Sequence, residues 1–475
     1  MRKFSVETII YVLISMACVE AVAETPFSGS SGKSGVLSVP SENADNKLTP
    51  EEEAKRFNIF YQTTFIGQSK PGMSASYSGM NSLQPGYETG YTWTSTAHAG
   101  WKIAKNTEVF LNIEGVSGVP FSNLNGLGGF SNGEATRAQG PDLKLYRQRL
   151  FIRHTANLTG DVQKLDEEAN QFPMLVSSNR LVFTVGNFSL LDIVDDNAYA
   201  KDPRTQFLNW GNMTYSAFDY AADARGFGWG AGVEWYVDNW AFRLVRLSVP
   251  RTPNELVVDS QLGTHYGDTF EVERAHTLNN LPGKVRILAY RNRQIMSRYD
   301  DATAYLVANP SAVGSQAILN TRYGEQVKMG IGLNLEQKIS SNVGVYFRGM
   351  VSDGQTETLA FTEADNSIAV GLSVDGRAWS RPRDAFGISY LQNGLSDARK
   401  SYLQAGGVSF FIGDYDPVSG ASINYAPERI FETYYSWGAY KNIWLSANYQ
   451  RIQNPAYNAD RGPANFFGVR LHAEY

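Results

Sequence analysis

Apolar and polar residues alternate one by one along most of the chain after Phe57. The final segment, 465–475, shows the pattern most clearly. One of its faces carries Phe467, Val469, Leu471, Ala473 and Tyr475, and the other carries Gly468, Arg470, His472 and Glu474. Successive side chains of a β-strand point to opposite sides of a sheet, so this period predicts strands with one apolar and one polar face.

The alternation predicts an all-β fold with an even number of strands. Sixteen segments carry it: 57–66, 92–104, 107–116, 145–156, 180–188, 227–237, 240–249, 269–278, 284–292, 326–338, 342–352, 367–375, 384–393, 427–437, 443–452 and 465–475. A strand at 212–221 would put neighbouring tight turns on opposite rims, so we place that segment in a long loop. Eighteen strands remain an alternative, if 402–412 pairs with a partner.

Short and long connections alternate between the predicted strands. Tight turns fall near 105–106, 238–239, 279–283, 340–342 and 441–442, and the long connections include 117–144, 188–226, 293–325 and 393–426. Aromatic residues gather at two of these turns: Trp235, Tyr236, Trp240, Trp437, Tyr440 and Trp444. Unequal rims with aromatic girdles are typical of a transmembrane β-barrel, whose apolar face meets lipid and whose polar face lines the lumen. A soluble β-sandwich fits less well, because the aromatic clusters lie at strand ends.

The N-terminal region predicts export. Residues 1–23 have the form of a signal peptide, with Arg2 and Lys3 before an apolar stretch and Ala21-Val22-Ala23 at the cleavage site. A lipid attached at Cys18 is a weaker alternative. Residues 24–56 form a flexible linker that ends in a short periplasmic helix, because Thr49 and Glu52 make a capping box around Pro50. Residues 57–475 are the barrel, and the mature chain has no cysteine.

Composition narrows the function. The net charge is −5 and aromatic residues make up 13% of the chain, with no basic patch of the kind that binds nucleic acid. The five histidines show no metal-ligand spacing, and no Ser-His-Asp order stands out. We therefore expect no enzyme activity, no metal and no cofactor. A secreted carbohydrate-binding protein is a further alternative, but the terminal aromatic residue, the girdles and the unequal rims argue against it.

Several longer strings resemble one known family in order along nearly the whole mature chain. They include FSNGEATRAQGPDLKLYRQRLFIR (130–153), DPRTQFLNW (202–210), AFDYAADARGFGWG (217–230) and NPAYNADRGPANFFGVRLHAEY (454–475). The chain resembles the carbohydrate-selective porins of the OprB type. The resemblance implies a 16-stranded outer-membrane barrel that lets glucose-like and other small sugars diffuse passively. A general or anion-selective porin remains the alternative.

A pore that favours neutral sugars needs hydrogen-bonding groups of both signs and an aromatic platform. Arg149 and Arg153 lie on one lumen-facing row, with Arg147 on the same parity, and their guanidinium groups can donate to sugar hydroxyls. Asn112 and Glu114 face them from the preceding strand. Pairing of these charges with one another, without any solute contact, is an equally weighted alternative.

The long connection 188–226 is the first candidate for a constriction, and 117–144 is the second. The first holds Asp202, Arg204, Trp210 and Asp219. Trp210 either stacks on a sugar ring or anchors the loop to the wall. Expected partners are small sugars, outer-membrane lipid and the barrel-assembly machinery, which reads a C-terminal strand ending here in Tyr475.

Overall fold

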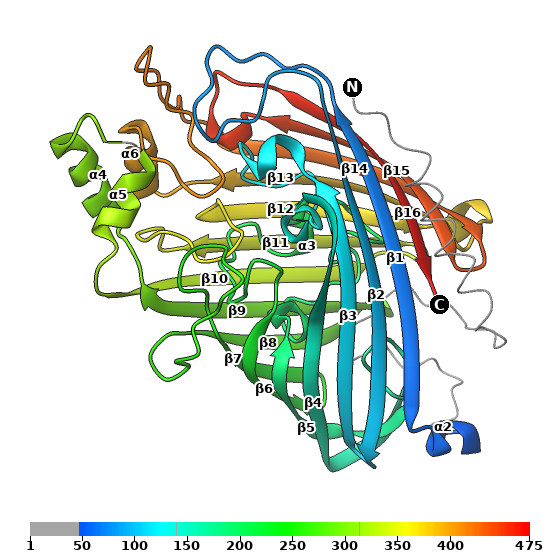
Figure 1. Ribbon diagram of the computed structural model, residues 1–475. Coiled ribbons are helices and arrows are strands. Elements are labelled where there is room, and N and C mark those ends of the chain that lie inside the picture. Colours follow the sequence, from blue (N-terminus) through cyan, green and yellow to red (C-terminus); the bar gives the residue numbers. More distant parts are fainter. Residues whose placement is uncertain (1–46, 139, 313) are drawn as a thin grey trace.

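The computed structural model describes residues 47–138, 140–312 and 314–475, and a closed antiparallel barrel dominates it (Figure 1). The strands are β1 Phe57–Lys70, β2 Glu88–Ala104, β3 Thr107–Val119, β4 Gly140–Leu165, β5 Met174–Phe188, β6 Gly228–Val237, β7 Trp240–Leu247, β8 Tyr266–Leu278, β9 Leu281–Ile295, β10 Glu325–Lys338, β11 Val343–Ser352, β12 Asn366–Asp375, β13 Ala385–Gly394, β14 Glu428–Tyr440, β15 Ile443–Gln453 and β16 Ala464–Glu474. Each pairs with its neighbours in sequence, and β1 pairs with β16 to close the barrel. The prediction of sixteen strands is confirmed.

No strand forms in the two segments that decided the count. The segment 212–221 begins within the short helix α3 (Trp210–Met213) and continues as a loop inside the β5–β6 connection. Helix α6 (Asp397–Gln404) occupies the start of 402–412. Placing all tight turns on one rim therefore gave the correct number of strands.

The alternation separates an outer apolar wall from an inner polar one. On β3, Leu111 and Ile113 are each 40% exposed, whereas Asn112 and Glu114 are buried inside the barrel. On β16, Phe467 and Val469 are exposed and Arg470 is buried. An outer wall of apolar side chains and a polar interior is the arrangement expected for a barrel that crosses an outer membrane.

The two rims differ as predicted. One rim has short turns, flanked by outward-facing Trp235, Trp240 and Trp437. Tyr236 and Trp444 are exceptions among the predicted girdle residues. Tyr236 faces the lumen beneath Arg180, whose guanidinium carbon lies 4.2 Å from the ring centroid. Trp444 lies on the inner-face parity of β15, and its ring packs 5.9 Å from that of the buried His472. Helix α2 (Pro50–Ala54) lies at this rim, and its Thr49 capping box is present.

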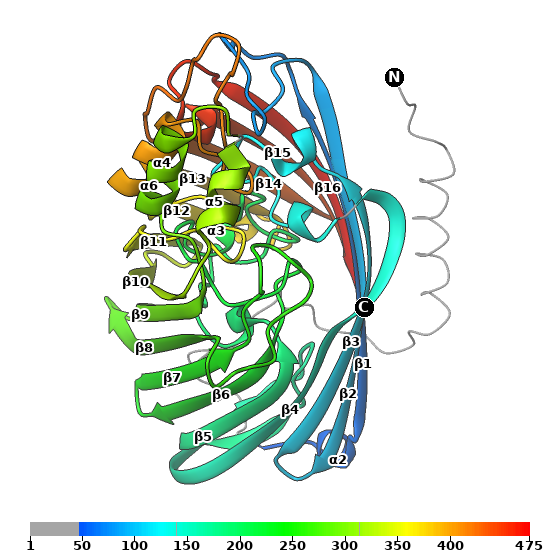
Figure 2. The same ribbon diagram turned by 60° about the vertical axis from the view of Figure 1, so that its left-hand side comes forward.

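The other rim carries the long connections and most of the remaining helices. These are α4 (Tyr299–Ala308), α5 (Gly314–Thr321), α6 and the 3-10 helices η1 (Phe121–Leu124), η2 (Ala135–Arg137), η3 (Leu190–Asp192) and η5 (Pro455–Tyr457), whereas η4 (Gly376–Trp379) lies at the short-turn rim. Figure 2 shows α4, α5 and α6 packed beside one another above the barrel wall. Among the described residues, none of the helices is long and apolar enough to cross a bilayer.

The hydrophobic core lies inside the barrel, where the long connections fold inward. One cluster joins Trp210, Phe218 and Tyr220 of the β5–β6 connection to Leu288 and Tyr290 of β9. A second joins Phe207 to Tyr346 of β11 and Tyr434 of β14. The lumen is therefore narrowed by packed loops rather than left as an open tube. The predicted signal peptide and most of the predicted linker lie outside the described residues.

Candidate functional site

The β5–β6 connection, residues 189–227, crosses the lumen and is fixed to opposite walls. Glu432 of β14 accepts the backbone N–H of Leu208 at 2.6 Å. Arg470 of β16 donates to the backbone carbonyls of Pro203 and Gln206 at 2.9 and 2.6 Å. Arg348 of β11 donates to Asp195 at 3.0 Å. These contacts hold the connection across the lumen, and its role as the constriction stays a prediction.

A buried charge cluster attaches this connection to β3. The Nη2 atom of Arg204 lies 2.7 Å from Glu114 and 2.8 Å from Glu134. Glu114 also accepts from Thr96, Gln148 and Tyr146. Burial alone would lower the pKa of the Arg204 guanidinium, but the charges of Glu134 and Glu114 outweigh it and raise the pKa well above its usual value. The cluster is therefore a fixed structural joint.

Two further ion pairs of the same connection keep part of their surface open. Arg149 of β4 makes a two-pronged contact with Asp192, with both N–O distances 2.7 Å. The side chain of Asp192 is 24% exposed. Lys201 pairs with Asp196 at 2.7 Å, and both side chains are about one fifth exposed. We call Arg149, Asp192, Asp196 and Lys201 the lumen quartet.

The lumen quartet has acidic groups that stay charged. Burial would raise the pKa of Asp192, but the charge and hydrogen bonds of Arg149 outweigh it, and the pKa lies below its usual 3.8. Burial likewise opposes ionisation of Asp196, and Lys201 reverses that effect. The quartet thus contributes two positive and two negative charges, each on a side chain that keeps part of its surface exposed. The ring of Phe227, which is itself buried, packs 5.1 Å from the Arg149 guanidinium and supports it from behind.

Most predicted site residues hold the loops and are not open to solute. Trp210 is 1% exposed and stacks on Tyr220, so the structure favours its anchoring role. Asp219 is buried, accepts the backbone N–H groups of Leu359 and Ala360, and lies 3.7 Å from Lys328 of β10. Asp202 differs from these two, because it accepts the backbone N–H of Arg204 but stays partly exposed. These contacts match the alternative in which lumen charges satisfy one another.

The prediction that Arg147 faces the lumen is wrong. The pairing of β3 with β4 passes from Asn112–Arg149 to Ile113–Arg147, so β4 carries one extra residue at that step. Such a β-bulge shifts the alternation by one residue, so the part of β4 before it has the opposite parity to the part after it. Arg147 therefore lies on the outer wall, where its guanidinium stacks 4.8 Å from the centroid of Trp229.

Asn112 and Arg153 do face inward, but in different settings. Asn112 is fully buried, and among the described residues its amide atoms have no hydrogen-bond partner. Arg153 lies near the short-turn rim and donates to the backbone carbonyl of Asn170 at 2.9 Å. Of the predicted residues, Glu114 and Arg204 are brought into contact and Arg149 lies close to them. Asp219 lies on the far side.

Other lumen charges were not singled out from the sequence. Glu134 and Arg137 join the Arg204 cluster from the β3–β4 connection. A ladder on β7 to β10 links Arg243, Glu271, Glu273, Arg286 and Glu336. Strand parity places the ladder residues on the inner face, so alternation alone could have found them. The positions of Glu134 and Arg137 depend on the path of a loop.

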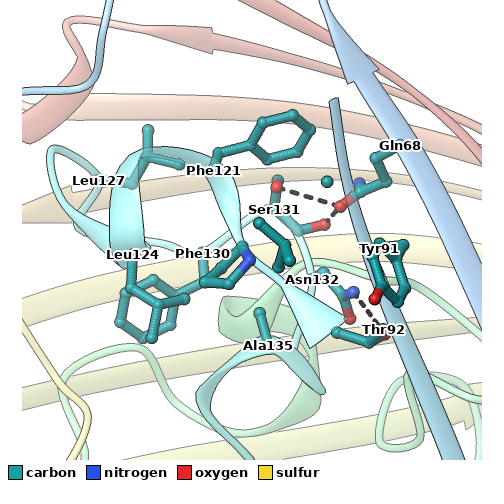
Figure 3. A pocket seen from close by; sticks show the side chains of 13 residues that line it. Gln68, Tyr91, Thr92, Phe121, Leu124, Leu127, Phe130, Ser131, Asn132 and Ala135 are labelled. Carbon is teal, nitrogen blue, oxygen red and sulfur yellow. Dashed lines mark hydrogen bonds between the residues drawn. The ribbon is translucent and has the colours of Figure 1, made fainter. Parts of the chain in front are cut away.

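The β3–β4 connection fills the lumen near β1 and β2. Figure 3 shows its residues Ser131 and Asn132 bonded to Gln68 and Thr92 of those strands. Phe121, Leu124 and Phe130 pack around them and leave a hollow of about 20 Å³. A hollow of that size holds about one water molecule. This loop therefore narrows the barrel without forming a sugar-sized pocket of its own.

The turn between β4 and β5 folds back into the opposite mouth of the barrel. Phe172 is fully buried and packs on Phe110 of β3, with ring centroids 6.0 Å apart. Asn58 of β1 donates to the carbonyl of Gln171, and the carboxylate of Glu108 accepts the N–H of Phe172. No pattern in the sequence predicted this second inward fold.

Comparison with known proteins gives the family. Residues 63–475 match the family described as carbohydrate-selective porin, OprB family. No curated protein sequence matches the chain. OprB of Pseudomonas putida in its high-pH structure is similar over 88% of this chain and 94% of its own, with 16% identity and a TM-score of 0.62. Its low-pH structure covers 88% and 93%, with 11% identity and a TM-score of 0.47.

A third solved structure, the outer-membrane channel DcaP of Acinetobacter baumannii, covers 88% of this chain and 97% of its own, with 8% identity and a TM-score of 0.48. At such identities the likeness concerns the fold alone. The family match spans most of the chain, and it agrees with the closed barrel of sixteen strands and its polar lumen. The chain belongs to the OprB family of carbohydrate-selective porins and is a sugar-diffusion channel of the bacterial outer membrane.

Proposed function

We propose that sugars cross the constriction along the lumen quartet, Arg149, Asp192, Asp196 and Lys201. The single observation that carries this proposal is that these four groups form two ion pairs that stay partly exposed, while most other lumen charges are buried. Fixed donors and acceptors can exchange hydrogen bonds with hydroxyl groups of a passing sugar. Contacts of this kind are weak enough for the solute to leave, as conduction requires.

The balance of charge favours neutral solutes of the glucose-like class. A cation or an anion meets both signs within the quartet and gains no net attraction. A sugar meets an acceptor and a donor at each pair. Of the four quartet residues, only Arg149 lies on a strand. It is therefore the best position for a test.

Liposome swelling tests the proposal. Vesicles containing the wild-type protein, Arg149→Gln or Asp192→Asn are placed in isotonic glucose, maltose or succinate. We expect either substitution to slow glucose entry into the vesicles. In planar bilayers, we expect the block of ionic current by sugar to weaken on the order of tenfold, the factor equivalent to 1.4 kcal/mol. Arg149→Gln leaves an unpaired carboxylate and should also shift ion preference toward cations.

The matched control is Arg147→Gln, which removes an arginine two residues away on the outer wall. It should swell like the wild type. If Arg149→Gln and Asp192→Asn also swell like the wild type, the quartet is not the selective region. If succinate enters faster than glucose through the wild-type channel, the anion-selective alternative is correct.

The barrel-assembly machinery is the proposed partner of the C-terminal strand. β16 presents exposed Phe467 and Val469 to the outside, and Tyr475 pairs through its backbone with Tyr61 of β1. Tyr475→Ser should reduce the amount of folded barrel in cells while the purified protein still refolds in detergent. Equal amounts of folded protein in cells would contradict this role.

A further inference from the structure

An arginine cluster lies on the outer wall of the barrel, on β7, β8 and β9. Arg246, Asp268 and Arg291 face one another across these strands. Arg246 donates to both oxygens of Asp268 at 2.7 and 2.8 Å, and Arg291 donates to the same carboxylate at 2.9 Å. Arg293 lies opposite Tyr266. We call Arg246, Arg291 and Arg293 the outer arginine cluster.

The cluster is exposed although it lies on the lipid-facing side. The side chains of Arg246 and Arg291 are 42% and 51% exposed. Leu244, on the same face of β7 two residues earlier, is 56% exposed, and Phe270, two residues after Asp268 on β8, is 46% exposed. Charge on the lipid face costs about 2–4 kcal/mol at mid-membrane but about 0–1 kcal/mol near the interfaces. The cluster therefore marks the headgroup level at the long-loop rim.

The arginines are arranged as a positively charged platform. The guanidinium carbon of Arg246 lies 3.8 Å from the ring centroid of Tyr266, and that of Arg291 lies 5.4 Å from it. Arg293 pairs with Glu325 of β10. At the exposed surface, three guanidinium groups face two carboxylates, Asp268 and Glu325, whereas the nearby carboxylate of Asp259 is buried and pairs with His265. The exposed groups therefore include one more positive than negative charge. Guanidinium forks match phosphate oxygens in two-pronged contacts.

An apolar hollow begins next to this platform. It has a volume of about 740 Å³ and is lined by Ile287, Ile331, Leu333, Gly349, Val351 and Ile368 on β9 to β12, together with polar residues at its edge. Ala289 pairs with Ile331, and Arg291, two residues further along the same face, pairs with Met329. Figure 2 shows β7 to β12 side by side on this wall. A headgroup on the arginines would thus place an acyl chain in the hollow.

We propose that the outer arginine cluster and the hollow together bind one phosphorylated glycolipid of the outer leaflet. Its phosphomonoester lies on Arg246, Arg291 and Arg293, and an acyl chain lies over Gly349. A phosphomonoester fits better than a zwitterionic headgroup, because the unbalanced charge of the platform is positive. The competing occupant of the hollow is a second copy of the barrel.

Native mass spectrometry of the full mature protein in detergent tests this site. The probes are lipid A with its phosphates, the same lipid dephosphorylated, and phosphatidylcholine. We expect the wild type to retain phosphorylated lipid A, and Arg246→Gln/Arg291→Gln/Arg293→Gln to bind it about tenfold more weakly. Gly349→Leu, which fills the hollow, should weaken the binding of both the phosphorylated and the dephosphorylated lipid A.

Arg274→Gln is the matched control. Arg274 is another exposed arginine of β8, but it lies at the short-turn rim, where it stacks on Trp240. This variant should retain lipid A like the wild type. The proposal is overturned if the triple variant, shown to be folded by heat-dependent mobility, binds phosphorylated lipid A like the wild type. It is also overturned if the wild type binds the dephosphorylated lipid equally well. A third contradicting result would be wild-type dimers that Gly349→Leu abolishes while lipid binding stays unchanged.

Discussion

Glu114 shows how a lumen charge serves the structure. It is fully buried, pairs with Arg204 and accepts hydrogen bonds from Thr96, Gln148 and Tyr146. A carboxylate with so many partners has little left to offer a solute. Its contribution is to hold the β5–β6 connection at a fixed distance from β3, so that other residues of that connection can meet water.

Glu114→Gln should destabilise the folded barrel. The substitution leaves the buried Arg204 guanidinium with a partner missing, and loss of one member of a buried ion pair costs about 3–5 kcal/mol. Urea unfolding in detergent, followed by tryptophan fluorescence, measures the effect. Arg147→Gln, on the outer wall, should change the free energy of unfolding by about 0.5 kcal/mol or less. Equal effects of the two substitutions would contradict the assigned role of Glu114.

The lumen quartet should be insensitive to pH over a wide range. The pKa values of Asp192 and Asp196 lie below 3.8 in the folded protein. A lowered pKa gives stability that is present above the unfolded value and is lost as pH falls through the folded value. Sugar block of single-channel current should therefore stay constant from pH 7 to about 4 and weaken only below that. A midpoint near pH 6 would contradict the assignment.

The turn between β4 and β5 packs Phe172 into one mouth of the barrel, and shortening this turn should change the conductance. Replacing residues 166–173 with a two-residue Asn-Gly turn removes Phe172 from the barrel mouth. Single-channel conductance in potassium chloride should rise, because the mouth widens, while sugar block should persist because the quartet is untouched. Exchanging the turn Lys441–Asn442 for Asn-Gly on the same rim is the control and should change neither. Unchanged conductance after the first replacement would show that this turn does not limit ion flow.

The strands were predictable from the sequence because each follows a local rule. Alternation identified all sixteen, and the parity of the turns removed 212–221. The bulge in β4 was not predictable, since its extra residue is defined only by pairing with β3. The connections 188–226 and 117–144 were expected to fold inward, but the contacts that fix them escaped prediction. Arg470 and Glu432 hold residues 203–209 from more than 200 positions away in sequence, and no local pattern encodes such contacts.

For the whole molecule, the closed barrel and the connections that fill its lumen together determine the channel. Pairing of β1 with β16 closes the sheet, so no strand is left with a wholly unpaired edge. A sixteen-stranded barrel would otherwise enclose a wide aqueous lumen. The connections β3–β4 and β5–β6 fill much of that space and leave balanced charges at the constriction. We therefore expect a narrow, selective channel rather than a general one.

Single-channel recording in planar bilayers distinguishes a sugar channel from a general or anion-selective pore. The protein is inserted, and the ionic current is measured while glucose, maltose or succinate is added. We expect small conductance steps that glucose and maltose block in a concentration-dependent way and that succinate leaves almost unchanged. Large steps that neither sugar reduces, or block by succinate alone, would contradict this expectation.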